Sequence, residues 1–236
     1  AVRALARMIV ALPAGDPAAR RAESVWEFVL KRTAQRANRV GGYPYAVGIL
    51  AASAPADAAS ERLAEAFRVL VECLPRPRCT ADVVDALSRI AAAPCGDADR
   101  RVQTVDLLCR LVDRPLGEEE TSLRAVETSQ GTVFEITGRL EFDTDTLPAA
   151  VTGLARIALS DAASDALRGR IAEMCLRLWD EVAAWKRVWG PRGAAAMAAA
   201  LSGIGAHPRS DAALRVRALK GLARGIERLA VVKALD

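Results

Sequence analysis

The sequence predicts an all-α protein in which short helices stack in pairs. Alanine recurs in almost every segment while aromatic residues make up only 4% of the chain, a composition that favours close-packed helices over sheets. The 236 residues are 52% hydrophobic with a formal net charge of +4, so the chain is apolar enough to bury a core. An aspartate also recurs at intervals of 41, 40, 64 and 50 residues, each time after an apolar segment with helical spacing.

These aspartates predict where the second helix of each pair begins. Aspartate is a favoured N-cap because its carboxylate accepts hydrogen bonds from the unpaired N–H groups of the first helical turn. The five aspartates are Asp16, Asp57, Asp97, Asp161 and Asp211. Apolar residues precede them by seven positions and by ten, which is the i, i+3 spacing of one helical face. These residues are Ile9, Leu50, Ile90, Leu154 and Ile204 at seven, and Ala6, Val47, Leu87, Val151 and Leu201 at ten.

The helices expected after Asp57 and Asp161 share one apolar template. Both aspartates open the same string, Asp-Ala-Ala-Ser, and both are followed by apolar residues at offsets of 6, 10, 13 and 17. The matching residues are Leu63, Phe67, Leu70 and Leu74 in one segment and Leu167, Ile171, Met174 and Leu178 in the other. The template predicts two helices that bury equivalent faces.

The spacing of the caps resembles that of HEAT and armadillo-type repeats, whose helix pairs recur every ~40–47 residues. The resemblance covers most of the chain, and it implies one α-solenoid domain over residues 1–236, a right-handed α-α superhelix of about five to six helix pairs. HEAT-like modules usually serve as binding scaffolds, so the resemblance implies a shape and no chemistry. Because the chain lacks an initiator methionine and stops within a helical pattern, we expect a fragment of a longer protein.

One acidic segment interrupts the repeat. Residues 117–145 contain eight acidic and two basic side chains, and we expect an irregular insertion there. Within it, residues 132–136 and 139–142 alternate around Thr137-Gly138 and predict a short β-hairpin near 121–145. A degenerate helical repeat is the alternative.

Catalytic and metal-binding patterns are missing from the sequence. The single histidine, His207, precedes a proline in an expected turn, and the five cysteines form no C-x-x-C pair. No serine lies in a G-x-S-x-G elbow, and no glycine-rich phosphate loop follows an expected strand. We therefore expect no catalytic residue, no metal ion and no cofactor.

The last helix carries the clearest candidate binding surface. Residues 186–236 contain ten basic and three acidic side chains, and part of this excess follows helical spacing at Arg217, Lys220, Arg224 and Arg228. Such a stripe can neutralise nucleic-acid phosphates or meet an acidic protein. A solvated helical face is the alternative interpretation, and we favour it.

Three tryptophans form a second candidate site. The pair Trp179-Asp180 resembles the tryptophan and aspartate of HEAT-like DNA glycosylases that excise alkylated bases, and Trp185 and Trp189 follow it on one helical face. Packing inside the solenoid is the alternative role for all three. A nucleic-acid-binding module, including such a glycosylase, is therefore the second functional hypothesis.

The first functional hypothesis is a non-catalytic scaffold or adaptor for protein–protein interaction. Residues 46–54 and 193–206 contain no charged side chain, so we expect another protein, or the rest of a larger chain, to cover them. The positive net charge of the chain is also compatible with an acidic protein partner or a nucleic acid. No apolar run reaches the ~18 residues needed to span a bilayer, so we expect no membrane partner and a cytoplasmic location.

Overall fold

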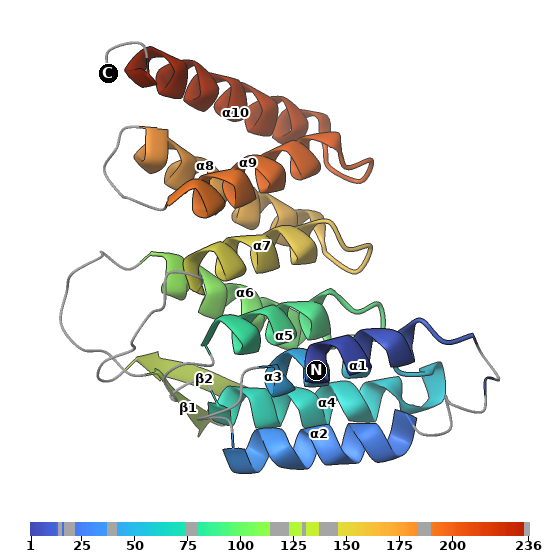
Figure 1. Cartoon of the computed structure of the whole chain (residues 1–236). Coiled ribbons are helices and arrows are strands. Elements are labelled where there is room, and N and C mark those ends of the chain that lie inside the picture. The colour runs from blue at the N-terminus through green and yellow to red at the C-terminus, as the bar shows by residue number, and fades with distance from the viewer. Residues whose placement is uncertain are drawn as a thin grey trace.

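A computed structural model describes the chain except for residues 14–15, 17–21, 37–41, 74–79, 114–122, 129–130, 137–145, 184–189 and 234–236. In the described part, ten helices and one two-stranded hairpin follow one another (Figure 1). The helices are α1 Val2–Val10, α2 Ala22–Arg36, α3 Tyr43–Ala52, α4 Ala56–Cys73, α5 Thr80–Ala92, α6 Ala98–Val112, α7 Thr146–Ala158, α8 Asp165–Ala183, α9 Gly190–Ala206 and α10 Ala212–Lys233. The strands are β1 Leu123–Thr128 and β2 Gly131–Ile136. The predicted helical class is confirmed.

The helices lie in two layers. In the odd-helix layer, α1, α3, α5, α7 and α9 each contact the next member, and the closest associations are α3 with α5 and α5 with α7. In the even-helix layer, α2 contacts α4, α6 contacts α8 and α8 contacts α10. The first pair and α10 therefore lie at opposite ends of the molecule (Figure 1).

The predicted apolar stripe of the first helices forms the centre of the core. All five residues ten positions before the aspartates are buried, from Ala6 at 1% exposure to Leu201 at 0%. The residues seven positions before them are also buried, except for half-buried Ile9, which packs against the core. Burial of one such stripe per helix against the neighbouring helix is the main stabilising contribution in this layer.

The shared template of the second helices is also confirmed where it is described. Leu63, Phe67 and Leu70 are buried in α4, and Leu167, Ile171 and Leu178 are buried in α8. Met174 is half-buried and packs against the core, while Leu74 lies outside the described residues. The two segments thus bury equivalent faces, as the sequence predicts.

The predicted caps are confirmed at two of the five aspartates. The Asp97 carboxylate accepts from the N–H groups of residues 99 and 100 at the start of α6, and Asp211 accepts from that of Leu214 in α10. Asp57 lies within α4, which begins one residue earlier, so it is not the cap. Residues 17–21 lie outside the described part, so the cap at Asp16 stays a prediction.

The cap predicted at Asp161 is wrong, because α8 begins four residues later and Ser164 Oγ accepts the N–H of Leu167 at 3.3 Å. The string Asp-Ala-Ala-Ser is therefore helical at residues 57–60 and a turn at 161–164. An arginine four residues after the true cap explains the register. Arg168 sends its guanidinium back to the end of the preceding helix, whereas the matching residue, seven after Asp57, is Ala64, which cannot make this contact.

The same contact, from an arginine side chain to the end of the preceding helix, occurs with the same spacing in two helix pairs. Arg101 Nε donates to the Ala91 carbonyl at 2.8 Å, and Arg168 Nε donates to the Ala158 carbonyl at 3.0 Å, ten residues back in each case. The Nη2 atoms reach carbonyls eight residues back, on residues 93 and 160. Arg168 is only 1% exposed, and burial lowers the pKa of Arg101. Each guanidinium thus satisfies one carbonyl at a helix end, that of Ala91 or Ala158, and gives a second donor to the carbonyl of residue 93 or 160, which already accepts a backbone N–H.

The hairpin is formed by residues 123–136, whereas the sequence predicts it at residues 132–142. Residues 132–136 do form a strand, but their antiparallel partner is β1, with Leu123 opposite Ile136 and Thr128 opposite Gly131. The predicted second strand, 139–142, lies outside the described residues, as does the rest of the acidic insertion. The error arose because Thr137-Gly138 offers a glycine turn, whereas the actual connection at residues 129–130 is Ser-Gln.

The lack of charge in α3 has an intramolecular cause, which corrects the expectation that another protein covers this segment. Helices α1, α2, α4 and α5 all contact α3, and seven of its ten residues are buried. A Cβ on Gly48 would lie 2.5 Å from the Ala86 Cα, so α3 and α5 touch backbone to backbone. In α9, by contrast, Ala195, Ala199, Ser202 and Ala206 are exposed.

Buried thiols in α6 and α8 give a pH prediction. Burial raises the pKa of Cys109 to about 11 and that of Cys175 to about 12. Because an unfolded chain ionises these thiols near the ordinary value of 9.0, it loses protons that the folded chain keeps, so the free energy of unfolding falls as the pH rises above about 9. Below that pH the contribution is fully present.

We expect exposed Cys95 to be alkylated by iodoacetamide in the native state, and Cys109 and Cys175 only after denaturation. Peptide mass spectrometry measures the alkylation of each cysteine. Guanidinium unfolding at neutral and alkaline pH measures the predicted fall in the free energy of unfolding. The Cys109→Ala, Cys175→Ala variant is the control, since its stability must fall less over the same pH range. Native alkylation of Cys175 at a rate equal to that of Cys95 would contradict the burial of this thiol.

Candidate functional site

Three arginines gather around one buried tyrosine in the odd-helix layer. Tyr45 in α3 is 7% exposed, and the guanidinium carbons of Arg3, Arg7 and Arg89 lie 5.4, 5.4 and 5.0 Å from its ring centroid. Arg7 Nε also donates to the Tyr45 hydroxyl at 2.9 Å. Cations at this distance from an aromatic ring are attracted by its electron-rich face.

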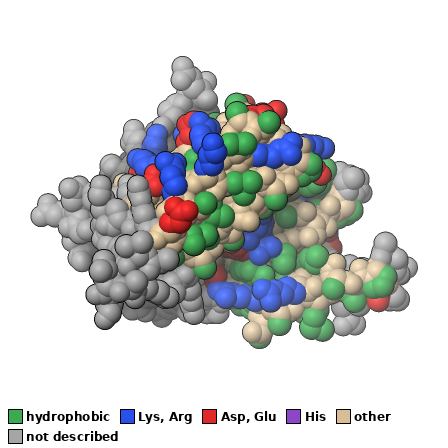
Figure 2. Space-filling view, turned by 90° about the horizontal axis from the view of Figure 1, so that it is seen from above, with side chains coloured by type: hydrophobic (Ala, Val, Ile, Leu, Met, Phe, Trp, Pro, Cys, Tyr) green, Lys and Arg blue, Asp and Glu red, His purple; other side chains and the backbone are tan. Residues whose placement is uncertain are grey.

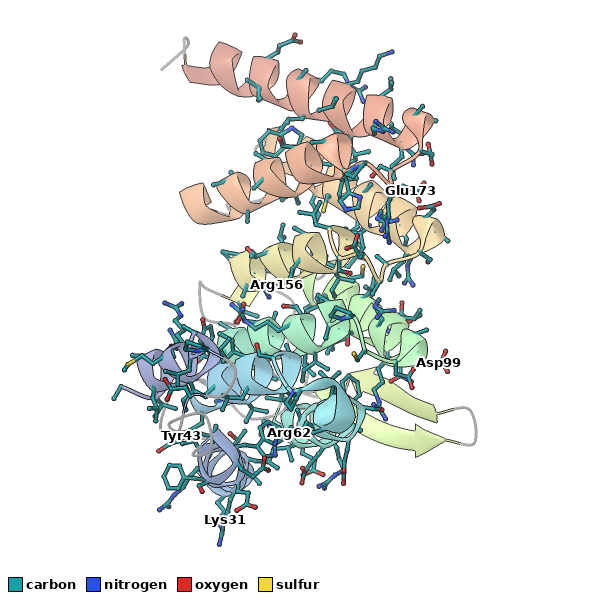
Figure 3. The ribbon with its side chains drawn as sticks, turned by 90° about the vertical axis from the view of Figure 1, so that its right-hand side faces the viewer. Lys31, Tyr43, Arg62, Asp99, Arg156 and Glu173 are labelled. Atoms are coloured by element: carbon teal, nitrogen blue, oxygen red, sulfur yellow. The ribbon has the colours of Figure 1, made fainter. Side chains whose placement is uncertain are left out.

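Two aspartates of α5 hold these arginines in place. Arg3 pairs with Asp82, and this hydrogen bond is the main reason why the pKa of Arg3 is raised. Arg89 and Arg156 share the Asp85 carboxylate at 2.7 and 2.8 Å. Arg156 comes from α7 and lies on the side of the molecule where α1 also lies (Figure 3). We call Arg3, Arg7, Arg89 and Arg156 the arginine cluster.

The arginine cluster carries more positive charge than its own carboxylates neutralise. Four guanidinium groups face two aspartates, and Arg7 forms no ion pair among the described residues. Arg3 keeps 55% of its side chain exposed and Arg156 keeps 25%. Guanidinium forks of this kind bind carboxylates and phosphates in two-point geometry, so the arrangement is suited to an anionic ligand.

Local sequence explains how each helix supplies its part of the cluster. Arg3 and Arg7 are four residues apart and therefore share one face of α1. Gly42 has φ of 105°, a conformation that glycine adopts without strain, and its N–H donates to Asp82 Oδ2 at 2.8 Å. The sequence analysis missed this site because its residues come from four helices; the spacing of the two α1 arginines was the only signal.

The basic stripe predicted on the last helix is present, and a line of exposed apolar residues lies beside it. Arg217 pairs with Glu173 of α8 at 3.3 Å, while Lys220 and Arg224 form no ion pair with a described residue. The side chain of Arg228 lies outside the described part. Apolar residues lie beside these cations, with Val216 50%, Leu219 48% and Ile226 53% exposed. Figure 2 shows hydrophobic and basic side chains side by side at this end of the molecule.

We call this surface of α10 the end strip. Its open hollow, about 880 Å³ in volume, is lined by apolar and charged side chains in alternation. The lining residues are Ala212, Ala213, Val216, Arg217, Lys220, Ala223, Arg224 and Glu227. An exposed apolar line on a surface helix is typical of an interaction site.

The predicted aromatic site is not assembled by the described residues. Trp179 is 3% exposed, and its indole Nε1 donates to the Leu222 carbonyl of α10 at 3.4 Å. Its ring fills the space beside Gly225, where a Cβ would overlap it. Trp179 thus packs α8 against α10, while Trp185 and Trp189 lie outside the described residues.

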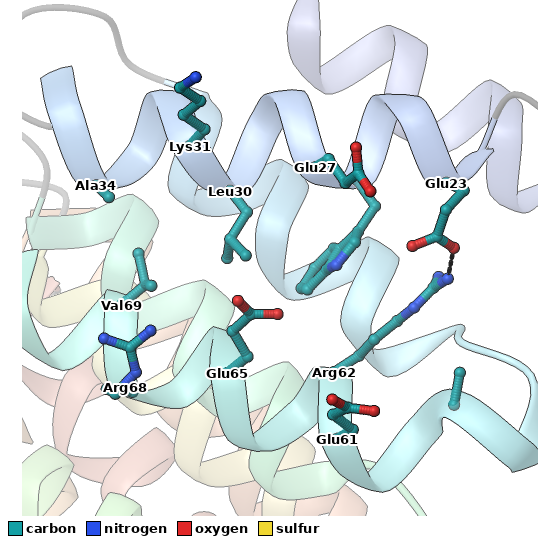
Figure 4. A pocket seen from close by; sticks show the side chains of 12 residues that line it. Glu23, Glu27, Leu30, Lys31, Ala34, Glu61, Arg62, Glu65, Arg68 and Val69 are labelled. Atoms are coloured by element: carbon teal, nitrogen blue, oxygen red, sulfur yellow. Dashed lines mark hydrogen bonds and ion pairs between the residues drawn. The ribbon is translucent and has the colours of Figure 1, made fainter.

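A second hollow lies between α2 and α4 in the even-helix layer. We call this hollow, about 670 Å³ in volume, the acidic groove. Glu23, Glu27, Glu61 and Glu65 line it together with Lys31, Arg62 and Arg68. Buried Trp26 forms part of its floor, and the Arg62 guanidinium carbon lies 5.7 Å from the centroid of the indole ring. Arg62 also pairs with Glu23 across the groove (Figure 4).

Comparison with protein-family models, curated proteins and solved structures finds no match for this chain. Among the described residues, no group of three or more His, Cys, Asp or Glu side chains is placed to hold a metal ion. None of the described helices is long and apolar enough to cross a bilayer.

Proposed function

We propose that this protein is a HEAT-like solenoid scaffold that binds an acidic segment of a partner protein at the arginine cluster. The observation that carries the proposal is the excess of guanidinium groups in the arginine cluster, four against Asp82 and Asp85. The layered helix pairs support the solenoid, and the ten described helices correspond to five pairs. A right-handed superhelix is part of the same proposal.

The cluster is prepared for binding before a ligand arrives. The Tyr45 ring and the Asp85 carboxylate fix the guanidinium planes of Arg89 and Arg156, so little side-chain entropy is lost on binding. An incoming carboxylate gains a two-point contact with Arg7, which among the described residues donates to the neutral Tyr45 hydroxyl and to no carboxylate. An acidic peptide that lies across α1, α5 and α7 meets all four cations.

Nucleic-acid binding remains the second proposal, because guanidinium groups bind phosphates as well. The observation that weighs against a base-reading site is the burial of Trp179 between two helices. The end strip also places Val216 and Leu219 next to its cations, and apolar side chains contribute nothing to phosphate contacts. We therefore place the acidic-protein interaction first.

Fluorescence anisotropy tests this function with a fluorescein-labelled peptide of alternating aspartate and serine. We expect binding that weakens with added salt, and we expect Arg7→Ala combined with Arg89→Ala to weaken it by about tenfold, because two guanidinium contacts are lost. The matched control is Arg170→Ala combined with Arg177→Ala, which removes the same charge from exposed positions on α8.

Equal losses in the cluster variant and in the control would show that only net charge attracts the peptide, which would contradict the site. A labelled DNA duplex is measured in parallel. Tighter binding of the duplex than of the peptide, lost in the same cluster variant, would overturn the protein-binding proposal and support the nucleic-acid alternative.

A further inference from the structure

The even-helix layer contains a regular ladder of ion pairs between successive helices. Arg170 and Arg177 of α8 pair with Asp106 and Asp113 of α6, and Arg217 of α10 pairs with Glu173 of α8. Counted from the N-cap, the acids stand at positions 9 and 16, and the arginines of the following helix stand at positions 6 and 13. Each helix therefore shows acids to the next helix and arginines to the previous one.

Helix α10 departs from this rule at position 9, although it keeps an acid, Glu227, at position 16. Position 9 after Asp211 is Lys220, where α6 and α8 have Asp106 and Glu173. A next helix with an arginine at position 6 would place that arginine against Lys220, and like charges at this distance repel. At this position the end strip is thus unsuited to another helix of the same register, and its unpaired cations, Lys220 and Arg224, are complementary to an acidic surface.

An acidic surface with unused charge exists at the other end of the same chain. In the acidic groove, Glu27, Glu61 and Glu65 form no ion pair with a described residue, whereas Arg62 is paired with Glu23 and Arg68 with Glu72. The apolar part of the groove consists of Trp26, Leu30, Ala34, Ala58 and Val69. The groove therefore offers apolar contact with uncompensated carboxylates beside it (Figure 4).

The two surfaces also match in pattern, and the strip is long enough to cover the groove. The α2 side of the groove runs from Glu23 to Ala34, about 16 Å at 1.5 Å per residue. The end strip runs from Ala212 to Glu227, about 22 Å on the same basis. Both place an apolar line beside a line of charge, and the signs of the uncompensated charges are opposite. Because α2 and α10 lie at opposite ends of the molecule (Figure 1), the strip and the groove cannot meet within one chain.

We infer that the end strip of one chain docks into the acidic groove of a second copy. Val216, Leu219 and Ala223 pack over the apolar floor, and Lys220 and Arg224 meet Glu27 and Glu65. This contact joins two different surfaces, so each added copy leaves one strip and one groove open, and the association continues until a ring closes or a filament grows. The inference is independent of the arginine cluster, which contributes no residue to either surface.

Sedimentation velocity of the full chain measures this association directly. We expect the weight-average mass to rise above the 25.1 kDa of one chain as the concentration increases from micromolar to millimolar, and to fall when salt is added, because the charge contacts are screened. Two variants test the contribution of each surface separately. The groove variant is Glu27→Lys with Glu65→Lys, and the strip variant is Lys220→Glu with Arg224→Glu.

Each variant alone should weaken the association more than about tenfold, because like charges then face each other. A mixture of the two should associate again, since each chain supplies the surface that the other has lost. The control is Asp99→Lys with Asp161→Lys, which changes the charge as much as the groove variant does, at exposed positions outside both surfaces, and should associate as the unmodified chain does. Circular dichroism verifies that all variants fold.

Three results would overturn the inference. A groove variant that still forms dimers would show a symmetric contact between two α10 helices. A chain that stays monomeric at all concentrations would show that no second copy occupies the strip. Association that the mixture of variants does not restore would show that strip and groove do not meet. The peptide measurements on the arginine cluster are unaffected by any of these outcomes.

Discussion

Replacement of Arg168 by alanine should destabilise the protein by about 3 kcal/mol, because the buried Ala158 carbonyl loses its donor and the space of a large buried side chain is left empty. The guanidinium is 1% exposed, and it donates to the Ala158 carbonyl at 3.0 Å and to the Ser160 carbonyl at 3.1 Å. Thermal unfolding followed by circular dichroism should show a melting temperature lower by roughly 6–12 °C.

Two further variants define what Arg168 contributes. Arg170→Ala removes an exposed arginine of the same helix, whose ion pair with Asp106 lies at the surface, and it should cost less than about 1 kcal/mol. Arg168→Lys keeps the charge but has no planar fork, and it should recover only part of the loss. If Arg168→Ala and Arg170→Ala had equal effects, the buried guanidinium would not be what holds α8 to α7.

The second large effect is expected at the contact between α3 and α5. A methyl group on Gly48 would lie 2.5 Å from the Ala86 Cα and 2.7 Å from its Cβ. Because the obstacle is backbone, no side-chain rotation relieves it, and the helices must move apart. Gly48→Ala should therefore destabilise the protein by about 3 kcal/mol, measured by guanidinium unfolding.

Gly169→Ala is the matched control, because nothing lies within 4 Å of the added methyl group. In that helix the change should raise the free energy of unfolding by ~0.5–1 kcal/mol, the difference between alanine and glycine in a helix interior. The two substitutions are chemically identical, so opposite signs would demonstrate the close approach of α3 and α5. A stabilised Gly48→Ala variant would contradict that packing.

The helices and their buried faces were predictable because they depend on local periodicity. Leu87, Ile90, Val151 and Leu154 were predicted from spacing alone and are buried. Two caps were also predicted correctly, since Asp97 and Asp211 act within their own helix turn. The start of α8 was not predictable in this way. Its register depends on Arg168, which contacts a carbonyl ten residues earlier in the chain.

The candidate sites also divide into one that depends on a single helix, which was predictable, and others that depend on contacts between helices, which were not. The cations of α10 were recognised because Arg217, Lys220 and Arg224 repeat on a single helix. The arginine cluster and the acidic groove were missed because each joins residues from separate helices, as in the contact of Arg156 with Asp85, 71 residues apart. Trp179 was considered as a ligand contact, and only packing against α10 showed that its ring is buried.

The sequence by itself determined the helical class, the apolar stripe of each first helix and the basic character of the end of the chain, because these properties are set by residues within a few turns of one another. Only the tertiary structure decided which charges remain uncompensated. Arg7 and Lys220 resemble the other basic residues in the sequence, and they differ because no carboxylate in the described part of the chain forms an ion pair with them. Pairing of charges depends on distances between helices, and the packing of the layers sets those distances.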